Sequence, residues 1–148
     1  MPILKNLKQH RVLLDTHVFV WIMNDKPLLT KEFKKSFELV FKKHGALLSP
    51  MSVWEIGMLV DKKRIDLDMD VLEWVNRALE LSGMLLCPIT PRIAILSSRL
   101  PGEVHFDPVD RLLIATAHEE NAVLVTCDKK ILSYGEGKFI SVLDPSKC

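Results

Sequence analysis

The stretch VLLDTH, residues 12–17, places three aliphatic residues directly before a carboxylate, Asp15. Such an aliphatic run is typical of a β-strand that is buried on both faces. Asp15 then has two interpretations. It is a good N-cap for the helix that VFVWIM, residues 18–23, would form. In an open parallel α/β sheet, it also lies where ligand sites form, outside the carboxyl ends of the strands.

Similar apolar runs recur along the chain and alternate with longer amphipathic segments, as in βαβ units. The alternation predicts an α/β fold, a three-layer α/β/α sandwich with a central, mainly parallel sheet of about five strands. The expected strands are residues 11–15, 46–49, 85–89, 122–127 and 139–143. The expected helices are residues 16–24, 30–43, 52–63, 70–82, 91–99 and 108–121. Ser52 is expected to cap the third helix, with Glu55 completing a capping box.

Length and composition predict one globular domain, residues 11–148, after a flexible leader at residues 1–10. The net charge of +1 neither requires nor excludes a nucleic-acid partner. Three cysteines without a C-x-x-C pair argue against a disulfide framework and a thiolate zinc site, and they favour a reducing cytoplasm. No apolar run has the length of a signal peptide core or a membrane span, so a cytoplasmic protein is expected.

Four acidic residues occur at the same kind of junction between a strand and the helix after it. They are Asp15, Glu55, Asp110 and Asp128. In a parallel sheet with right-handed crossovers, these junctions all face one edge. Clustered carboxylates repel one another unless protons or a cation compensate. The pattern therefore predicts one or two Mg²⁺ or Mn²⁺ ions and suits phosphodiester hydrolysis.

Each acid also has a purely structural interpretation. Asp15 and Glu55 can act as helix caps, Asp110 can complement a helix dipole, and Asp128 can cap a short helix over DKKIL. Asp107 is expected to be the N-cap of the helix that begins at Pro108. The joint occurrence of the four acids, more than any single one, favours a metal site.

Three segments resemble the blocks of the PIN domain family, and in particular its branch of VapC-type toxins of type II toxin–antitoxin systems. They are VLLDTHVFVW, SPMSVWEIGMLVDKKRIDL and FDPVDRLLIATAHEENAVLVTCDKKI, and the resemblance covers residues 11–143. It implies an α/β/α fold and a Mg²⁺- or Mn²⁺-dependent endoribonuclease that hydrolyses RNA. It also implies an antitoxin partner, usually encoded beside the toxin.

The resemblance assigns catalytic and metal-binding roles to the same four acids, all of which are present. Thr16 and Thr126 match positions where the family often has a small hydroxyl residue that can orient an acid or a metal-bound water. Arg111 follows the third acid, as in this branch, and is expected to pair with a carboxylate or contact a phosphate.

Lysines and arginines near the acids are candidates for RNA binding, with a solvated helix face as the alternative. They are Lys62, Lys63, Arg64, Lys129 and Lys130. The apolar segments VFVWI and MSVWEIGML suggest a protein interface, so a homodimer and an antitoxin groove are expected. Two alternatives stay open: a DNA nuclease with the same site, and a non-catalytic module that binds protein or RNA.

Overall fold

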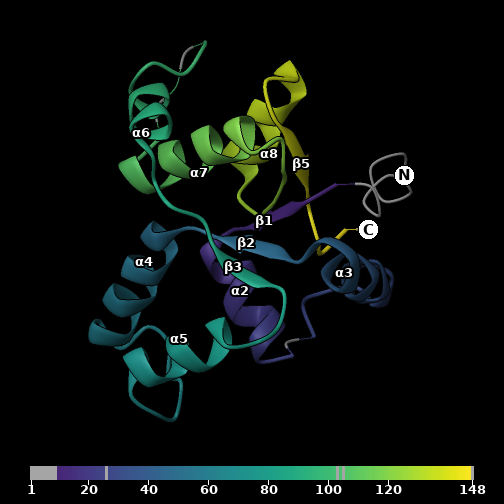
Figure 1. The fold of residues 1–148 in the computed structure, drawn as a ribbon, viewed down its shortest axis with the longest axis vertical. Helices are drawn as coiled ribbons and strands as arrows, with labels where there is room; N and C mark the ends of the chain where they lie inside the picture. The colour runs from purple at the N-terminus through teal and green to yellow at the C-terminus, as the bar shows by residue number, and fades with distance from the viewer. Residues whose placement is uncertain (1–9, 26, 103, 105, 148) are drawn as a thin grey trace.

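A computed structural model describes residues 10–25, 27–102, 104 and 106–147 (Figure 1). Five strands form one sheet in the order β3-β2-β1-β4-β5, and every neighbouring pair is parallel. The strands are β1 Val12–Leu14, β2 Ala46–Leu48, β3 Met84–Leu86, β4 Val123–Val125 and β5 Ser141–Leu143. The predicted fold class is confirmed, although each strand is only three residues long and shorter than the apolar run that predicted it.

Helices cover both faces of the sheet. They are α2 Thr16–Met23, α3 Lys31–His44, α4 Pro50–Asp61, α5 Val71–Leu79, α6 Pro91–Ser98, α7 Pro108–Glu119 and α8 Lys129–Tyr134, with a 3₁₀ turn, η2, at Gly135–Gly137. In Figure 1, α6, α7 and α8 lie above the sheet, and α2 to α5 lie below it. The result is the expected three-layer sandwich.

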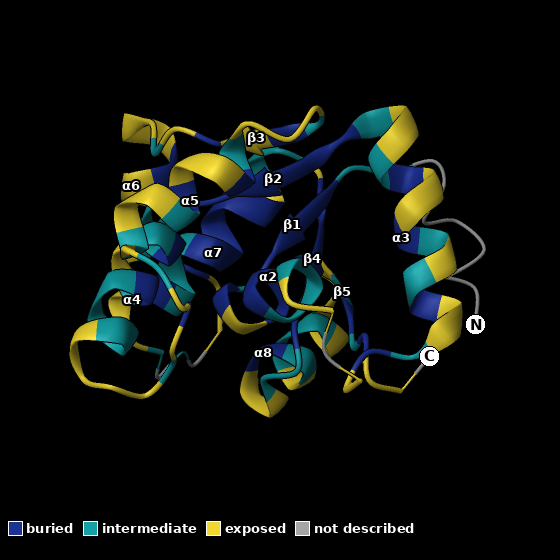
Figure 2. Ribbon diagram, turned by 90° about the horizontal axis from the view of Figure 1, so that it is seen from below, coloured by how far each residue is buried: buried dark blue, intermediate teal, exposed yellow. Residues whose placement is uncertain are grey.

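The core has two halves because successive strand residues point to opposite faces of the sheet. Val12 and Leu14 pack against α2, α3 and α5, whereas Leu13 packs against α6, α7 and α8. All three side chains are fully buried, and Figure 2 shows the central strands as the most buried part of the molecule. A strand buried on both faces explains the uninterrupted aliphatic run before Asp15.

Side-chain caps fix where the helices start. Thr30 accepts a hydrogen bond of 3.1 Å from the backbone N–H of Phe33 at the start of α3. The prediction that Ser52 caps α4 is wrong: Ser49 is the cap, and its hydroxyl accepts from Met51 N–H at 3.1 Å. Pro50 occupies the first helical turn, where its missing N–H costs nothing. The helix therefore begins at Pro50, before the predicted cap Ser52.

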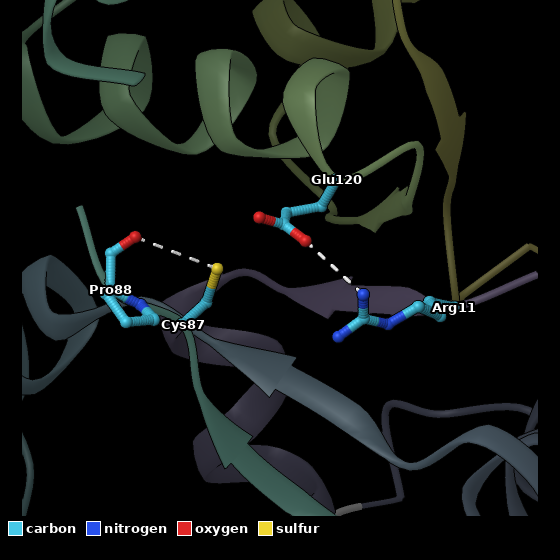
Figure 3. Close-up of polar contacts among 4 residues, drawn as sticks. All are labelled: Arg11, Cys87, Pro88 and Glu120. Carbon is cyan, nitrogen blue, oxygen red and sulfur yellow. Dashed lines mark hydrogen bonds and ion pairs between the residues drawn. The ribbon is translucent and has the colours of Figure 1, made fainter. Parts of the chain in front are cut away.

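An ion pair ties α7 to the start of β1 (Figure 3). Arg11 Nη1 lies 3.3 Å from Glu120 Oε2, and the Cys87 thiol lies beside this pair below α7. Burial, followed by the negative charge of Glu120, raises the pKa of Cys87. Cys87 and Cys127 are both free thiols, consistent with the expectation that the chain has no disulfide framework. The ion pair between Arg11 and Glu120 helps fix α7, the helix that carries Asp110.

Two expectations concern the ends and surface of the chain. The predicted leader lies outside the described residues except for His10. Within the part of the chain that the structure describes, none of the helices has the length and apolar character needed to cross a membrane.

Candidate functional site

The sheet has one topological switch point, between β1 and β4. The strands β2 and β3 lie on one side of β1, and the later strands β4 and β5 lie on its other side. In open α/β sheets, ligand sites form at this point, outside the carboxyl ends of the strands. Asp15 directly follows β1, and Thr126 directly follows β4. The topology therefore brings these residues to the position where a ligand site is expected.

Asp15 is held by hydrogen bonds to both of its carboxylate oxygens. Oδ1 accepts from the backbone N–H of Thr16 at 2.7 Å, which caps α2 as expected. Oδ2 accepts from the hydroxyl of Thr126 at 2.6 Å. Burial raises the pKa of Asp15, and although these hydrogen bonds and His17 act against it, the pKa stays above its ordinary value. Asp128 adds to the rise through charge repulsion.

Thr126 links two of the acids. Its buried hydroxyl donates to Asp15 and accepts from the backbone N–H of Asp128 at 3.0 Å. Asp128 in turn caps α8, because its Oδ1 accepts from Lys130 N–H at 2.8 Å and from Ile131 N–H at 3.1 Å. Both of these bonds use the same oxygen. The capping role expected for Asp128 is present, and Oδ2 is not part of the cap.

A hydrogen bond between two buried hydroxyl groups joins α2 to α4. The Thr16 hydroxyl donates to the Ser52 hydroxyl at 3.0 Å, and both side chains are fully buried. Ser52 and Glu55 are three residues apart on α4 and therefore lie on the same face of the helix. The contact orients the face that carries Glu55 toward the start of α2. Sequence reasoning missed this role of Ser52, and its signal was a serine one helical turn before the acid.

The pKa of Asp110 is raised by its surroundings. Burial raises its pKa to about 7, with further contributions, in decreasing order, from Asp107, Asp15, Asp128 and Glu55. Asp107 caps α7 as predicted, because its Oδ1 accepts from Asp110 N–H at 2.9 Å. The other three predicted acids therefore all act on Asp110 through space, although the four come from different elements.

A cavity of about 550 Å³ is lined by two of the four predicted acids, Asp110 and Asp128, and not by Asp15 or Glu55. Its lining residues are Phe106, Asp107, Asp110, Asp128, Lys129 and Lys130. Among the residues that the structure describes, no three His, Cys, Asp or Glu side chains form a ready-made metal-ligand cluster. The donors that are present are carboxylate oxygens, the ligand type that Mg²⁺ and Mn²⁺ prefer. The acids suit such an ion by chemistry and charge, and their side chains would have to turn toward it.

The predicted basic and supporting residues occupy different places. Lys129 and Lys130 line the cavity. The segment Lys62–Arg64 is exposed and follows the end of α4, about 10 Å along the helix from Glu55 at 1.5 Å per residue. Arg111 donates to two backbone carbonyls, Ser97 O at 2.8 Å and Val104 O at 3.3 Å, and makes no carboxylate pair among the described residues. Arg111 thus holds the connection between α6 and α7.

Comparison with known proteins gives matches to one family. The PIN domain family matches residues 12–137. Ribonuclease VapC22 of Mycobacterium tuberculosis is 30% identical over 131 residues, which make up 88% of this chain and 97% of that protein.

Solved structures give the same fold. VapBC2 from Rickettsia felis, crystallised with a DNA fragment from its promoter, matches with a TM-score of 0.66 at 17% identity, covering 90% of this chain and 97% of that one. A toxin–antitoxin complex from Klebsiella pneumoniae matches with a TM-score of 0.59 at 19% identity and the same coverage. At these identities, the structural likeness bears on the fold alone.

Proposed function

Because the chain belongs to the PIN domain family, we propose that it is a metal-dependent endoribonuclease and the toxin of a toxin–antitoxin pair. The name of its relative from Mycobacterium tuberculosis supports RNA as the substrate class. The observation that carries the proposal is the gathering of carboxylates around Asp110 beside an open cavity, where burial and then the charges of the neighbouring acids raise the pKa of Asp110 to about 7. A divalent cation would relieve the repulsion between these carboxylates.

The residues of the chain have distinct parts in the proposed reaction. Asp15, Glu55, Asp110 and Asp128 would hold Mg²⁺ or Mn²⁺, directly or through water. The bound ion supplies a polarised phosphoryl oxygen and an activated water. Thr126 restrains the Asp15 carboxylate, and the α8 cap restrains Asp128, so both acids are held by hydrogen bonds before the ion and the substrate bind.

Lysines at the cavity complete the proposed substrate contacts. Lys129 and Lys130 are exposed, line the cavity and immediately follow Asp128. Their ammonium groups would bind phosphates on either side of the cleaved bond, which positions the RNA backbone without reading its sequence. Lys62, Lys63 and Arg64 would contact RNA only beyond the cavity.

The proposed partners are an antitoxin and a second copy of the chain. Two structural neighbours, a VapBC assembly and a toxin–antitoxin complex, support the antitoxin. For the homodimer, the support lies at the sheet edge. Leu85 and Leu86 of edge strand β3 are exposed, as are Trp54 of α4 and Ile95 of α6. In Figure 1, β3 runs between α6 on one side and α4 and α5 on the other.

Cleavage of total cellular RNA tests the proposal. Purified wild-type protein and Asp15→Asn are compared in Mg²⁺, in Mn²⁺ and in EDTA. We expect discrete fragments from the wild type with either metal, none in EDTA, and a loss of about 100-fold or more in Asp15→Asn, as when a group that stabilises the transition state is removed. Asn is as good an N-cap as Asp, so α2 should stay formed.

The matched control is Asp61→Asn, which changes an exposed carboxylate at the end of α4. It should cleave like the wild type. Cleavage that survives EDTA, or that survives in Asp15→Asn, would contradict the metal mechanism. Folded wild-type protein that cuts single-stranded DNA but no RNA would identify a DNA nuclease, and folded protein that cuts neither would identify a binding module.

A further inference from the structure

We propose that Phe106 is the surface on which one nucleobase stacks while the adjoining phosphodiester lies at the carboxylates, an inference that rests on the proposed ribonuclease function. Phe106 is the one aromatic side chain among the described residues that line the cavity. It thereby gives this site a means of holding a base as well as a phosphate.

The chemistry of the cavity wall matches the parts of a single nucleotide. Asp110 and Asp128 are two of the four acids proposed to hold the metal ion, and Lys129 and Lys130 supply positive charge for phosphate. The ring of Phe106 supplies the apolar surface that a base requires. The volume of about 550 Å³ lies within the range of about 300–1,000 Å³ that is usual for ligand sites.

The ring of Phe106 is only partly buried. Part of it packs against the core beneath α6, α7 and α8, and part of it lines the cavity. Phe106 and Tyr134 meet edge to face, with centroids 5.7 Å apart and ring planes at 90°, so Tyr134 covers at most one face of Phe106. The part of the ring that lines the cavity is the kind of surface on which bases stack.

Three contacts restrain described residues on either side of Phe106 in the chain. The Tyr134 hydroxyl donates to Pro101 O at 2.8 Å, and Arg111 Nη1 donates to Val104 O at 3.3 Å. On the other side, Asp107 caps α7. A ring with restrained neighbours loses less freedom when a base stacks on it, which favours binding.

Stacking is the usual way in which proteins hold unpaired RNA bases. Replacement of a stacking aromatic residue commonly weakens binding by about tenfold per base, and the effect tolerates any base because every base has a π-face. Phe106 would therefore position the strand next to the cut without dictating a strict sequence.

The test is a cycle that removes the ring, the base or both. A 12-nucleotide RNA spanning a cut mapped in total RNA is synthesised intact and with an abasic ribose at each position in turn. Binding is measured in Mg²⁺ in the Asp15→Asn background, so that the RNA stays whole. Phe106→Leu removes the ring, Phe106→Trp restores one, and Phe139→Leu makes the same chemical change at a ring that packs against Tyr134 outside the cavity.

We expect Phe106→Leu to bind intact RNA about tenfold more weakly and to lose its sensitivity to the abasic ribose at one position beside the cut. Phe106→Trp should restore both, and Phe139→Leu should keep the sensitivity of the parent. Equal sensitivity in Phe106→Leu and the parent at every position would overturn the inference while leaving the ribonuclease function intact. Wild-type protein that neither cleaves nor binds RNA would overturn both.

Discussion

At the scale of single residues, the hydroxyl of Thr126 supports two acids at once, since it donates to Asp15 and accepts from Asp128 N–H. Thr126→Val keeps the shape but leaves the buried Asp128 N–H without its acceptor. We expect the free energy of unfolding to fall by about 1–3 kcal/mol, as measured by urea denaturation, together with a loss of RNA cleavage. Thr126→Ser keeps the hydroxyl and should retain most of both properties. If Thr126→Ser cost more than Thr126→Val, the methyl group rather than the hydroxyl would be the stabilising part.

Asp110 should make the metal-free protein less stable as the pH rises. Its pKa is raised from 3.8 to about 7 by burial and by the neighbouring acids, so the folded state binds more protons than the unfolded state between these values. The stabilisation from protonated Asp110 is complete below pH 4 and is lost as the pH rises through about 7. Solvent screening of this half-buried group reduces the effect to about 1–2 kcal/mol.

Urea denaturation in EDTA at pH 5 and pH 8 measures this effect, with Asp110→Asn as the test variant. The variant should lose the dependence that Asp110 contributes and should be more stable than the wild type at pH 8. Asp66→Asn, an exposed change in the loop after α4, should leave the pH dependence unaltered. A wild type whose stability is the same at both pH values, or rises with pH, would contradict the repulsion at the site.

At the scale of elements, two glycines should respond in opposite ways to replacement by alanine. Gly45 joins α3 to β2 with a φ of +72°, and a Cβ there would collide with the carbonyl oxygen of Gly83. Gly57 lies within α4, where a Cβ would meet nothing within 4 Å. We expect Gly45→Ala to destabilise by about 2 kcal/mol or more and Gly57→Ala to stabilise by about 0.5–1 kcal/mol, as read from thermal unfolding. A neutral Gly45→Ala would mean that the α3–β2 junction relaxes freely.

Features fixed by neighbouring residues could be predicted from the sequence, whereas contacts between residues far apart in the chain could not. The motif DPVD specifies its own cap, so Asp107 and the start of α7 could be predicted from four adjacent residues. Ser49 before Pro50 carries the same local signal as Asp107 before Pro108, so the cap of α4 was also predictable, whereas the bond from the distant Thr16 to Ser52 was not. Arg111 was assigned to a carboxylate or a phosphate, whereas its partners are carbonyls of a connection that shows no periodicity.

The strand order depends on pairing between residues far apart in the chain and was not predictable from the apolar runs. The positions of Asp15 after β1 and Asp128 after β4 were predictable, since each follows a recognisable apolar run, whereas Glu55 lies within α4 and Asp110 lies in the first turn of α7, which follows a helix and not a strand. Their mutual placement required the order β2-β1-β4, which sets Asp15 beside Asp128 and Glu55 on the opposite side of β1. The acids could therefore be identified from local sequence, whereas their arrangement depends on the strand order.

At the scale of the whole molecule, the exposed edge of the sheet should mediate self-association. An apolar, unpaired edge strand is a site where another chain binds. We expect the wild type to be a dimer at micromolar concentration and Leu86→Lys to shift it toward monomer, as measured by light scattering after gel filtration. Leu28→Lys, which changes an exposed leucine between α2 and α3, should remain a dimer. A monomeric wild type, or a dimer unaffected by Leu86→Lys, would contradict an interface at β3.

The position of β1 between β2 and β4 also bears on protein synthesis. A growing chain can pair β1 with β2 and β3 well before β4 has been made, and at that stage it carries only Asp15 and Glu55 of the four acids. Asp110 and Asp128 belong to the last third of the sequence, on elements that pack from the other side of the switch point. The proposed nuclease therefore cannot bring its four acids together until most of its chain has been synthesised.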